Sequence, residues 1–135
     1  MPARESFSDF LKRRAKASED FISGRSDSMM AMSSQRDPAT FFPIAGCAVS
    51  GAERVNDTHR LSARQFSPGG KGRLEILQSG SDVEMGFWAG ILHAEVIFKG
   101  EQEKVPMKLR ITEVFRRSEE GWKLVHRHAD EMKPD

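Results

Sequence analysis

Four stretches in the second half of the chain alternate apolar and polar residues with a period of two, which is the pattern of β-strands. The connections between them are short, and connections of this length join antiparallel neighbours. We therefore predict an antiparallel meander. Its strands are expected at residues 73–79, 83–99, 105–117 and 122–130.

The first half of the chain shows helical spacing instead. Ser6 and Asp9 are typical of a helix N-cap, and an apolar stripe with a period of about 3.6 residues follows them. Ser50 and Glu53 have the spacing of a capping box, which predicts the start of another helix. The predicted helices cover about residues 6–24, 26–34 and 51–66.

The apolar segment at residues 39–44 is interrupted by Pro43, so we predict a short edge strand or an extended segment there. Helices followed by an antiparallel meander make an α+β fold. With 135 residues the chain is expected to form one domain spanning residues 1–135. Residues 1–5 and 131–135 are expected to be loose termini.

The strand predicted at residues 83–99 carries apolar side chains on both faces. Phe87 and Ile91 belong to one alternating set, and Trp88 and Leu92 belong to the other. A strand that is apolar on both faces must be covered on both. Helices can cover one face, and a second subunit is the economical cover for the other, so we expect a homodimer.

Composition narrows the functional classes. The chain has 21 basic and 20 acidic residues, and a net charge of +1 gives no electrostatic footprint for nucleic acid or for an anionic membrane. Cys47 is the single cysteine, which fits a reducing compartment. There is no long uncharged apolar run and no signal-peptide core at the start of the sequence. We therefore predict a cytoplasmic protein.

The last predicted hairpin places ionisable residues on an apolar face. If residues 118–121 form its loop, Glu113 pairs with His126, and Ile111 pairs with His128. A carboxylate and two imidazoles then share a buried wall. A loop of three residues would instead swing His126 and His128 outward and keep Glu113 inward.

Glu113 and His126 are our candidate catalytic residues. A buried carboxylate beside an imidazole can be poised to exchange a proton with a bound substrate. The alternative is that the two side chains only satisfy each other as a cross-strand pair, with Arg14 or Arg127 nearby. Arg14 lies in the stripe of the first helix, and this position favours a surface arginine with a packed stem over a buried one aimed at an acid.

The same face offers a weak metal hypothesis. His126 and His128, joined by His93 on the neighbouring strand, could hold zinc, but this spacing is common by chance. We therefore predict no metal and no cofactor.

The glycine-rich residues 69–72 lack the strand-before, helix-after setting of a phosphate loop and are read as a turn. His59 is predicted to be a half-buried packing residue.

The order of elements, together with the ending Glu-Val-Phe-Arg-Arg at residues 113–117 and Gly-Trp-Lys-Leu-Val-His-Arg-His at residues 121–128, resembles the SnoaL-like, nuclear transport factor 2-like superfamily. The last hairpin is also similar to that of the calcium/calmodulin-dependent kinase II association domain. The resemblance implies a strongly curved sheet wrapped around the N-terminal helix to form a cone. It also implies a pocket at the open end and a homodimer through the outer sheet face.

Family membership does not fix an activity, because the same cone hosts enzymes and assembly modules. In the alignment with ketosteroid isomerase, Glu113 falls on an acid of the oxyanion hole, and His126 and His128 fall on pocket-lining positions. The position of that enzyme's catalytic base is occupied here by Phe42 and Pro43, so its mechanism is not expected. The kinase association domain has two pocket arginines where this chain has Glu113 and Ala129, so its anion preference is not expected either.

Two functions follow from these residues. The first is binding of a small apolar molecule in the cone, with isomerase, cyclase or dehydratase chemistry on Glu113 and His126. The second is a non-catalytic dimerisation or assembly module. For the first function, the residues expected to line the pocket are His128, Trp88, Phe115, Phe41 and Arg14.

Overall fold

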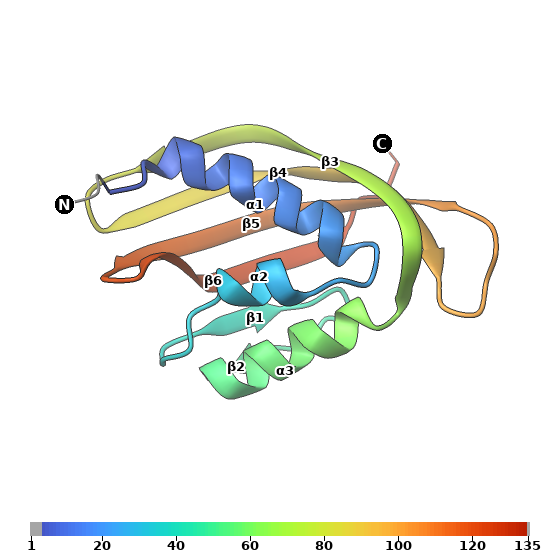
Figure 1. Ribbon diagram of the computed structural model, residues 1–135, viewed down its shortest axis with the longest axis horizontal. Coiled ribbons are helices and arrows are strands. Elements are labelled where there is room, and N and C mark those ends of the chain that lie inside the picture. Colours follow the sequence, from blue (N-terminus) through green and yellow to red (C-terminus); the bar gives the residue numbers. More distant parts are fainter. Residues whose placement is uncertain (1–3, 135) are drawn as a thin grey trace.

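A computed structural model describes residues 4–134 and shows three helices and a curved six-stranded sheet (Figure 1). The predicted α+β fold is confirmed, and the sheet curves around the first helix as the resemblance implied. The helices are α1 (Phe7–Phe21), α2 (Asp27–Ala31) and α3 (Ala52–Ala63). The strands are β1 (Thr40–Phe42), β2 (Val49–Ser50), β3 (Phe66–Ser81), β4 (Met85–Phe98), β5 (Val105–Ser118) and β6 (Gly121–Glu131).

The strand order is β2-β1-β6-β5-β4-β3. The predicted meander is confirmed as the antiparallel run from β3 to β6. The sequence did not predict that β1 pairs in parallel with β6, nor that β2 forms an antiparallel edge beside β1. These two short strands bring the segment after α2 alongside the last strand of the chain.

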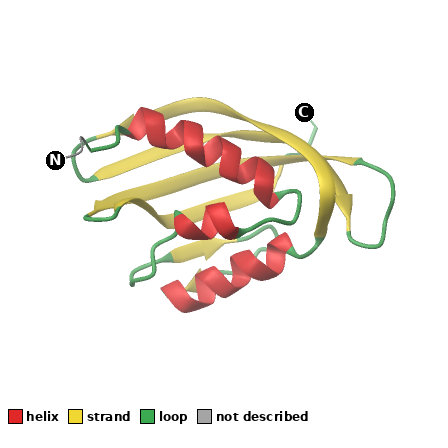
Figure 2. Cartoon of the chain, viewed as in Figure 1, coloured by secondary structure: helices red, strands yellow, loops and turns green. Residues whose placement is uncertain are grey.

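The three helices lie on one face of the sheet (Figure 2). The Ser6 hydroxyl accepts a hydrogen bond from the backbone N–H of Asp9 at 3.0 Å, which confirms the predicted N-cap of α1. The helix packs its apolar stripe on the sheet, where Phe10 contacts the edge of Phe115 with the ring centroids 4.9 Å apart. Burial of each such ring contributes roughly 1.5–3 kcal/mol to folding.

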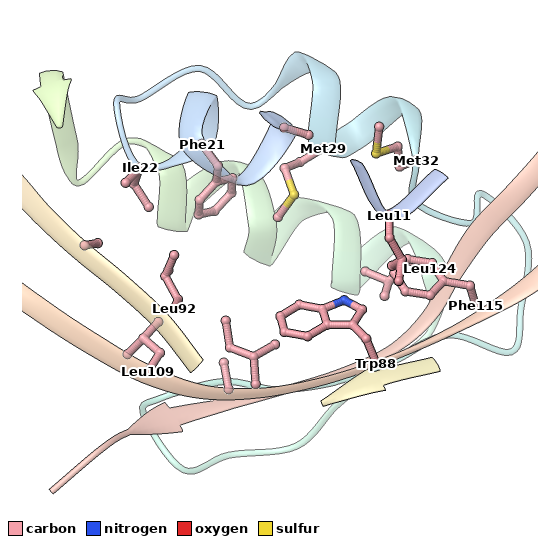
Figure 3. Packing of buried hydrophobic residues seen from close by; sticks show 14 of the residues in the cluster. Leu11, Phe21, Ile22, Met29, Met32, Trp88, Leu92, Leu109, Phe115 and Leu124 are labelled. Atoms are coloured by element: carbon pink, nitrogen blue, oxygen red, sulfur yellow. The ribbon is translucent and has the colours of Figure 1, made fainter. Parts of the chain in front are cut away.

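The main core lies between α1, α2 and the long strands. Figure 3 shows Trp88 and Leu92 pointing from the sheet toward Phe21 and Met29 of the helices. A second, smaller apolar cluster lies under α3 and includes Phe41. The α3 helix therefore covers β1 and β2 as a separate small layer.

The start of α3 differs from the prediction. Gly51 is the N-cap, with φ 101°, and no hydroxyl of a capping box bonds this end of the helix. Instead, Asp37 Oδ1 accepts a hydrogen bond from the backbone N–H of Ala52 at 2.7 Å. The predicted Ser50–Glu53 capping box is therefore wrong, because a carboxylate 15 residues upstream supplies the acceptor.

The glycine-rich residues 69–72 are part of β3, so their interpretation as a turn is also wrong. A register shift between Ser67 and Lys71 lets the strand bend there. Within the two ends predicted to be loose, Glu5 and Glu131 are held by hydrogen bonds. The Glu5 carbonyl accepts hydrogen bonds from Arg117 and Trp122, and Glu131 pairs with Leu109 in the sheet. Residues 1–3 and 135 lie outside the described residues.

The face of the sheet opposite the helices carries exposed apolar side chains. Phe42 on β1 is 39% exposed and Phe87 on β4 is 37% exposed. The two-faced strand predicted from the sequence is thus covered by helices on one side only. Among residues 4–134, no helix has the length and apolar character needed to cross a membrane.

Candidate functional site

The predicted register of the last hairpin is correct near the loop and wrong beyond it. Phe115 pairs with Leu124 as predicted, but the next pair is Val114 with His126. Val125 is therefore an extra residue on β6, and this β-bulge reverses the face of every later side chain. Glu113 consequently pairs with Arg127, and the predicted pair of Glu113 with His126 is wrong.

The bulge lies where β6 changes its neighbour. Leu124 donates its N–H to the carbonyl of Met32 and accepts from the N–H of Ser34. Two residues later, His126 pairs with Thr40 of β1. The extra residue at Val125 lets β6 pair with residues 32–34 on one side of the bulge and with β1 on the other. Because these partners lie outside the hairpin, the hairpin sequence alone did not predict the bulge.

Glu113 is the centre of a buried ion group. Its carboxylate accepts two hydrogen bonds from Arg14, from Nε at 2.9 Å and from Nη2 at 2.7 Å. Arg127 Nη1 donates to Oε2 at 2.5 Å, and the indole Nε1 of Trp88 donates to Oε1 at 2.8 Å. These four bonds use the whole accepting capacity of a carboxylate.

Four elements supply this group. Arg14 comes from α1, Trp88 from β4, Glu113 from β5 and Arg127 from β6. Arg14 and Glu113 are 99 residues apart in the sequence. The expectation that Arg14 is a surface arginine is wrong: its side chain is 1% exposed, because the bidentate bond to Glu113 compensates the cost of burying its charge.

The electrostatics hold Glu113 in its ionised form. Burial by itself raises the pKa of this carboxyl, but attraction and hydrogen bonds from Arg14 and Arg127 outweigh burial, so its pKa falls well below the ordinary 4.5. A carboxylate with such a low pKa has no tendency to carry a proton at neutral pH. Glu113 is therefore poorly suited to be a general acid or base.

The carboxylate is also closed to a ligand. The exposed fraction of Glu113 is 0% and that of Trp88 is 1%, so the carboxylate is out of contact with solvent. Two hollows of the described surface lie elsewhere. One is beside residues 33–38 and the hairpin loop, and the other is over the ends of β3, β4 and β5 on the outer face.

The structure brings some of the other predicted pocket residues near this group. Phe115 is 0% exposed, and its ring lies 5.5 Å from the Arg14 guanidinium carbon. Phe41 is buried in the smaller cluster under α3, against His59. These aromatic side chains fill the interior instead of lining an open space.

His126 and His128 lie on the outer face of the sheet. Because of the bulge they point away from Glu113, and both pack against the ring of Phe42, with centroid distances of 4.8 and 5.6 Å. The Thr40 hydroxyl is 2.7 Å from Nδ1 of His126. The predicted contact between Glu113 and His126 is absent, so the proposed catalytic pair lacks the geometry on which it rested.

A further polar pair is buried under α3. His59 is 3% exposed and Asn56 is 2% exposed. Asn56 donates to the carbonyl of Ser34 at 3.1 Å, but its Oδ1 and the Nε2 of His59 have no hydrogen-bond partner among the described residues. Burial, reinforced by Arg127 and Arg14, lowers the pKa of His59 to about 3, so its ring is neutral.

The positive charge of the interior exceeds its negative charge. Arg14 and Arg127 share one carboxylate, and neither bonds another acid within residues 4–134. Arg127 uses only Nη1 in that bond and remains 8% exposed. One net positive charge therefore lies close to the unpartnered atoms of His59.

The predicted histidines do not form a metal site. His93, His126 and His128 do not come together with another ligand, and the described residues contain no group of three histidine, cysteine or acidic side chains able to share a metal. His93 instead lies 2.7 Å from the Glu75 carboxylate on the neighbouring strand.

The sequence-based reasoning missed the inward orientation of Arg127 and the contacts of Thr40 and Phe42 with the histidines. One signal was present: Val125 and Ala129 are apolar at odd-numbered positions, whereas Trp122 and Leu124 are apolar at even-numbered ones. A change of parity within one strand is the mark of a bulge. The pairing with β1 carried no comparable signal.

Comparison with known proteins agrees with this architecture. The family described as the SnoaL-like domain matches residues 14–130. No curated protein matches the chain. A solved structure of a candidate dehydratase of the NTF2-like family from Streptomyces avermitilis is 16% identical, with a TM-score of 0.71, over 93% of this chain and 94% of that chain.

Two further solved structures come from assembly domains. A candidate calcium/calmodulin-dependent protein kinase type II association domain from Thiobacillus denitrificans is 17% identical, with a TM-score of 0.71, over 98% of this chain and 100% of its own. The S. rosetta CaMKII hub is 18% identical, with a TM-score of 0.69 and the same coverage. At these identities the similarity shows the fold.

Adjacent arginines allow a matched test of the ion group. We expect Arg14→Met to lower the free energy of unfolding by about 3–5 kcal/mol, because it removes one partner of a buried pair. Arg13 makes a similar bidentate bond to Glu5, but its side chain is 56% exposed, so Arg13→Met should cost only about 0–1 kcal/mol. Urea denaturation followed by tryptophan fluorescence measures both. Equal losses would contradict the assigned role of Arg14.

The low pKa of Glu113 gives a second test. Its pKa in the folded state lies below its ordinary 4.5, so its contribution to stability is complete above that pH and is lost as the pH falls further. We expect the stability of the wild-type protein to fall more steeply than that of Glu113→Gln below about pH 4.5, by up to about 1.4 kcal/mol per pH unit. Denaturation curves at stepped pH measure the difference. Parallel curves would mean that Glu113 is not the group that titrates.

Proposed function

The chain belongs to the SnoaL-like domain family, and from this premise we propose that it is a non-catalytic module for self-association, whose partner is a second copy of itself. The fold fits both a ligand-binding protein and an assembly domain, so the choice depends on the residues.

One observation carries the proposal: the Glu113 carboxylate, our candidate catalytic group, is enclosed by other side chains. Glu113 is 0% exposed and all its accepting capacity is used by Arg14, Arg127 and Trp88. A reacting group must come within hydrogen-bond reach of its substrate. The interior of the cone therefore serves as a rigid core that holds the sheet in shape.

The outer face offers the surface for the partner. The register places five residues side by side on β1, β6, β5 and β4, and we call this set the outer patch. The outer patch comprises Phe42, His126, His128, Val114 and Phe87. Its two phenylalanines are more than one third exposed, which is unusual for large apolar side chains clustered on a soluble surface.

Similar proteins support this choice of partner. Two of the solved structures with this fold are described as an association domain and a hub, which are names for assembly. A two-fold axis through the outer patch would bring each copy against the same surface of the other. A stable interface of this kind buries more than about 1,000 Å² in total. The cytoplasmic location predicted from the sequence remains part of this proposal.

Mass measurement tests the proposal directly. By light scattering or sedimentation velocity at neutral pH, we expect the protein to have twice the 15.2 kDa mass of the chain. Phe87→Glu and Phe42→Glu should each weaken the dimer at least about tenfold, because they place a charge in the buried centre of the interface.

The matched control is Leu61→Glu. Leu61 is an apolar residue on α3 that is 63% exposed and lies away from the outer face. This variant should remain dimeric. A wild-type protein that stays monomeric over the accessible concentration range, or dissociation by Leu61→Glu alone, would refute the proposed interface.

Binding of a small molecule is a second candidate function, and one observation favours it. The Nε2 of His59 and the Oδ1 of Asn56, which have no partner within residues 4–134, lie buried close to a net positive charge on Arg14 and Arg127. Buried polar groups are normally satisfied, so the site has unused bonding capacity. The excess positive charge favours a small acidic molecule over the apolar one predicted from the sequence.

Short carboxylates provide the probe for this candidate. If the site binds them, acetate, butyrate or succinate should raise the melting temperature, since a ligand stabilises the state that it binds. His59→Phe should abolish that rise and leave the unliganded protein about as stable as before, because it removes an unpaired polar atom. Arg36→Met, at a surface hollow, is the control. No rise with any carboxylate would eliminate this function.

A further inference from the structure

Two imidazoles occupy the middle of the outer patch. His126 and His128 meet the ring of Phe42 edge-on, at centroid distances of 4.8 and 5.6 Å. On their other side, His126 pairs with Val114, which in turn pairs with Phe87. Adjacent strands are about 4.8 Å apart, so His126 lies two strands, or about 10 Å, from Phe87.

Few charges face these rings. The neighbouring positions on β1, β5 and β4 are Thr40, Phe42, Thr112, Val114, Ala89 and Phe87, all uncharged. Asp130 is the nearby acid, at 3.8 Å from His128, and Arg110 already binds it through two hydrogen bonds of 2.7 Å. The outer patch therefore contains little that would stabilise an imidazolium once water is removed.

A second copy would remove that water. Across a two-fold axis each outer patch meets itself, so four imidazoles would come together between phenylalanine rings. Neutral imidazole is compatible with such a contact, but a buried and uncompensated imidazolium is costly. Burial, and secondly His128, already lower the pKa of His126 below its ordinary 6.5 within one chain.

We propose that His126 and His128 make self-association through the outer patch sensitive to pH, so that the dimer forms at neutral pH and dissociates in mild acid. This inference rests on the proposed function and adds its regulation. The sign follows from linkage: the separate chains can bind a proton on His126 that the dimer excludes. Acid therefore favours the separate chains, in the range below pH 6.5 where His126 titrates.

Sedimentation velocity of the full chain at about pH 7.5 and about pH 5 tests the inference. We expect the dissociation constant of the wild-type dimer to rise about tenfold or more on acidification. In the double variant His126→Asn, His128→Asn, the dimer should persist at both values, with a change of less than about threefold. If the dimer of the double variant persists at about pH 5, then general acid unfolding does not cause the dissociation of the wild-type dimer.

His93→Asn is the matched control. His93 is another imidazole on the outer face, but it lies outside the outer patch and 2.7 Å from a carboxylate of Glu75. This variant should keep the full pH dependence. Monomer at both pH values would refute the proposed function, and this inference with it. A dimer that is equally tight at both values, or a pH dependence that survives the double variant or disappears in His93→Asn, would overturn this inference alone.

Discussion

The buried bond between Arg14 and Glu113 is the constraint on which the rest of the structure depends. Apolar burial is non-directional, whereas a buried guanidinium must meet its carboxylate at hydrogen-bond distance. The bidentate contact fixes α1 in both rotation and height above β5. Trp88 and Arg127 complete the carboxylate from two more strands, so the curvature of the sheet is tied to the same atoms.

The two faces of the sheet differ in the side chains that they carry: the face under the helices holds the ion group, and the other is open to a partner. In the interior, Glu113 is satisfied by Arg14, Arg127 and Trp88, and aromatic rings such as Phe115 pack around this group. The outer face keeps exposed phenylalanines, with His126 and His128 packed against one of them. In this chain the residues able to meet another molecule are therefore mostly on the side of the sheet that faces away from the helices, and this is why we place the proposed interface there.

The sequence predicted what depends on local patterns. Alternation along the last four strands, the Ser6 cap and the stripe of α1 are all confirmed, because each is set by residues close together in the chain. The candidate site was only half predicted. Glu113 was recognised as a buried acid, but its partners depend on the bulge at Val125, which arises from contacts with Met32 and Ser34 almost a hundred residues earlier. The Asp37 cap of α3 escaped prediction for the same reason.

The 99 residues that separate Arg14 from Glu113 have a consequence for folding. The helix with the arginine is synthesised before the strands with Glu113 and Arg127. Contacts over so long a loop form slowly, because the entropy of closing the loop is lost before the contact is gained. During synthesis Arg14 thus has no acid to bind, and the apolar stripe of α1 stays exposed until the strands have been made. Closure of the core is expected to be a late and cooperative event, completed only when the last hairpin arrives.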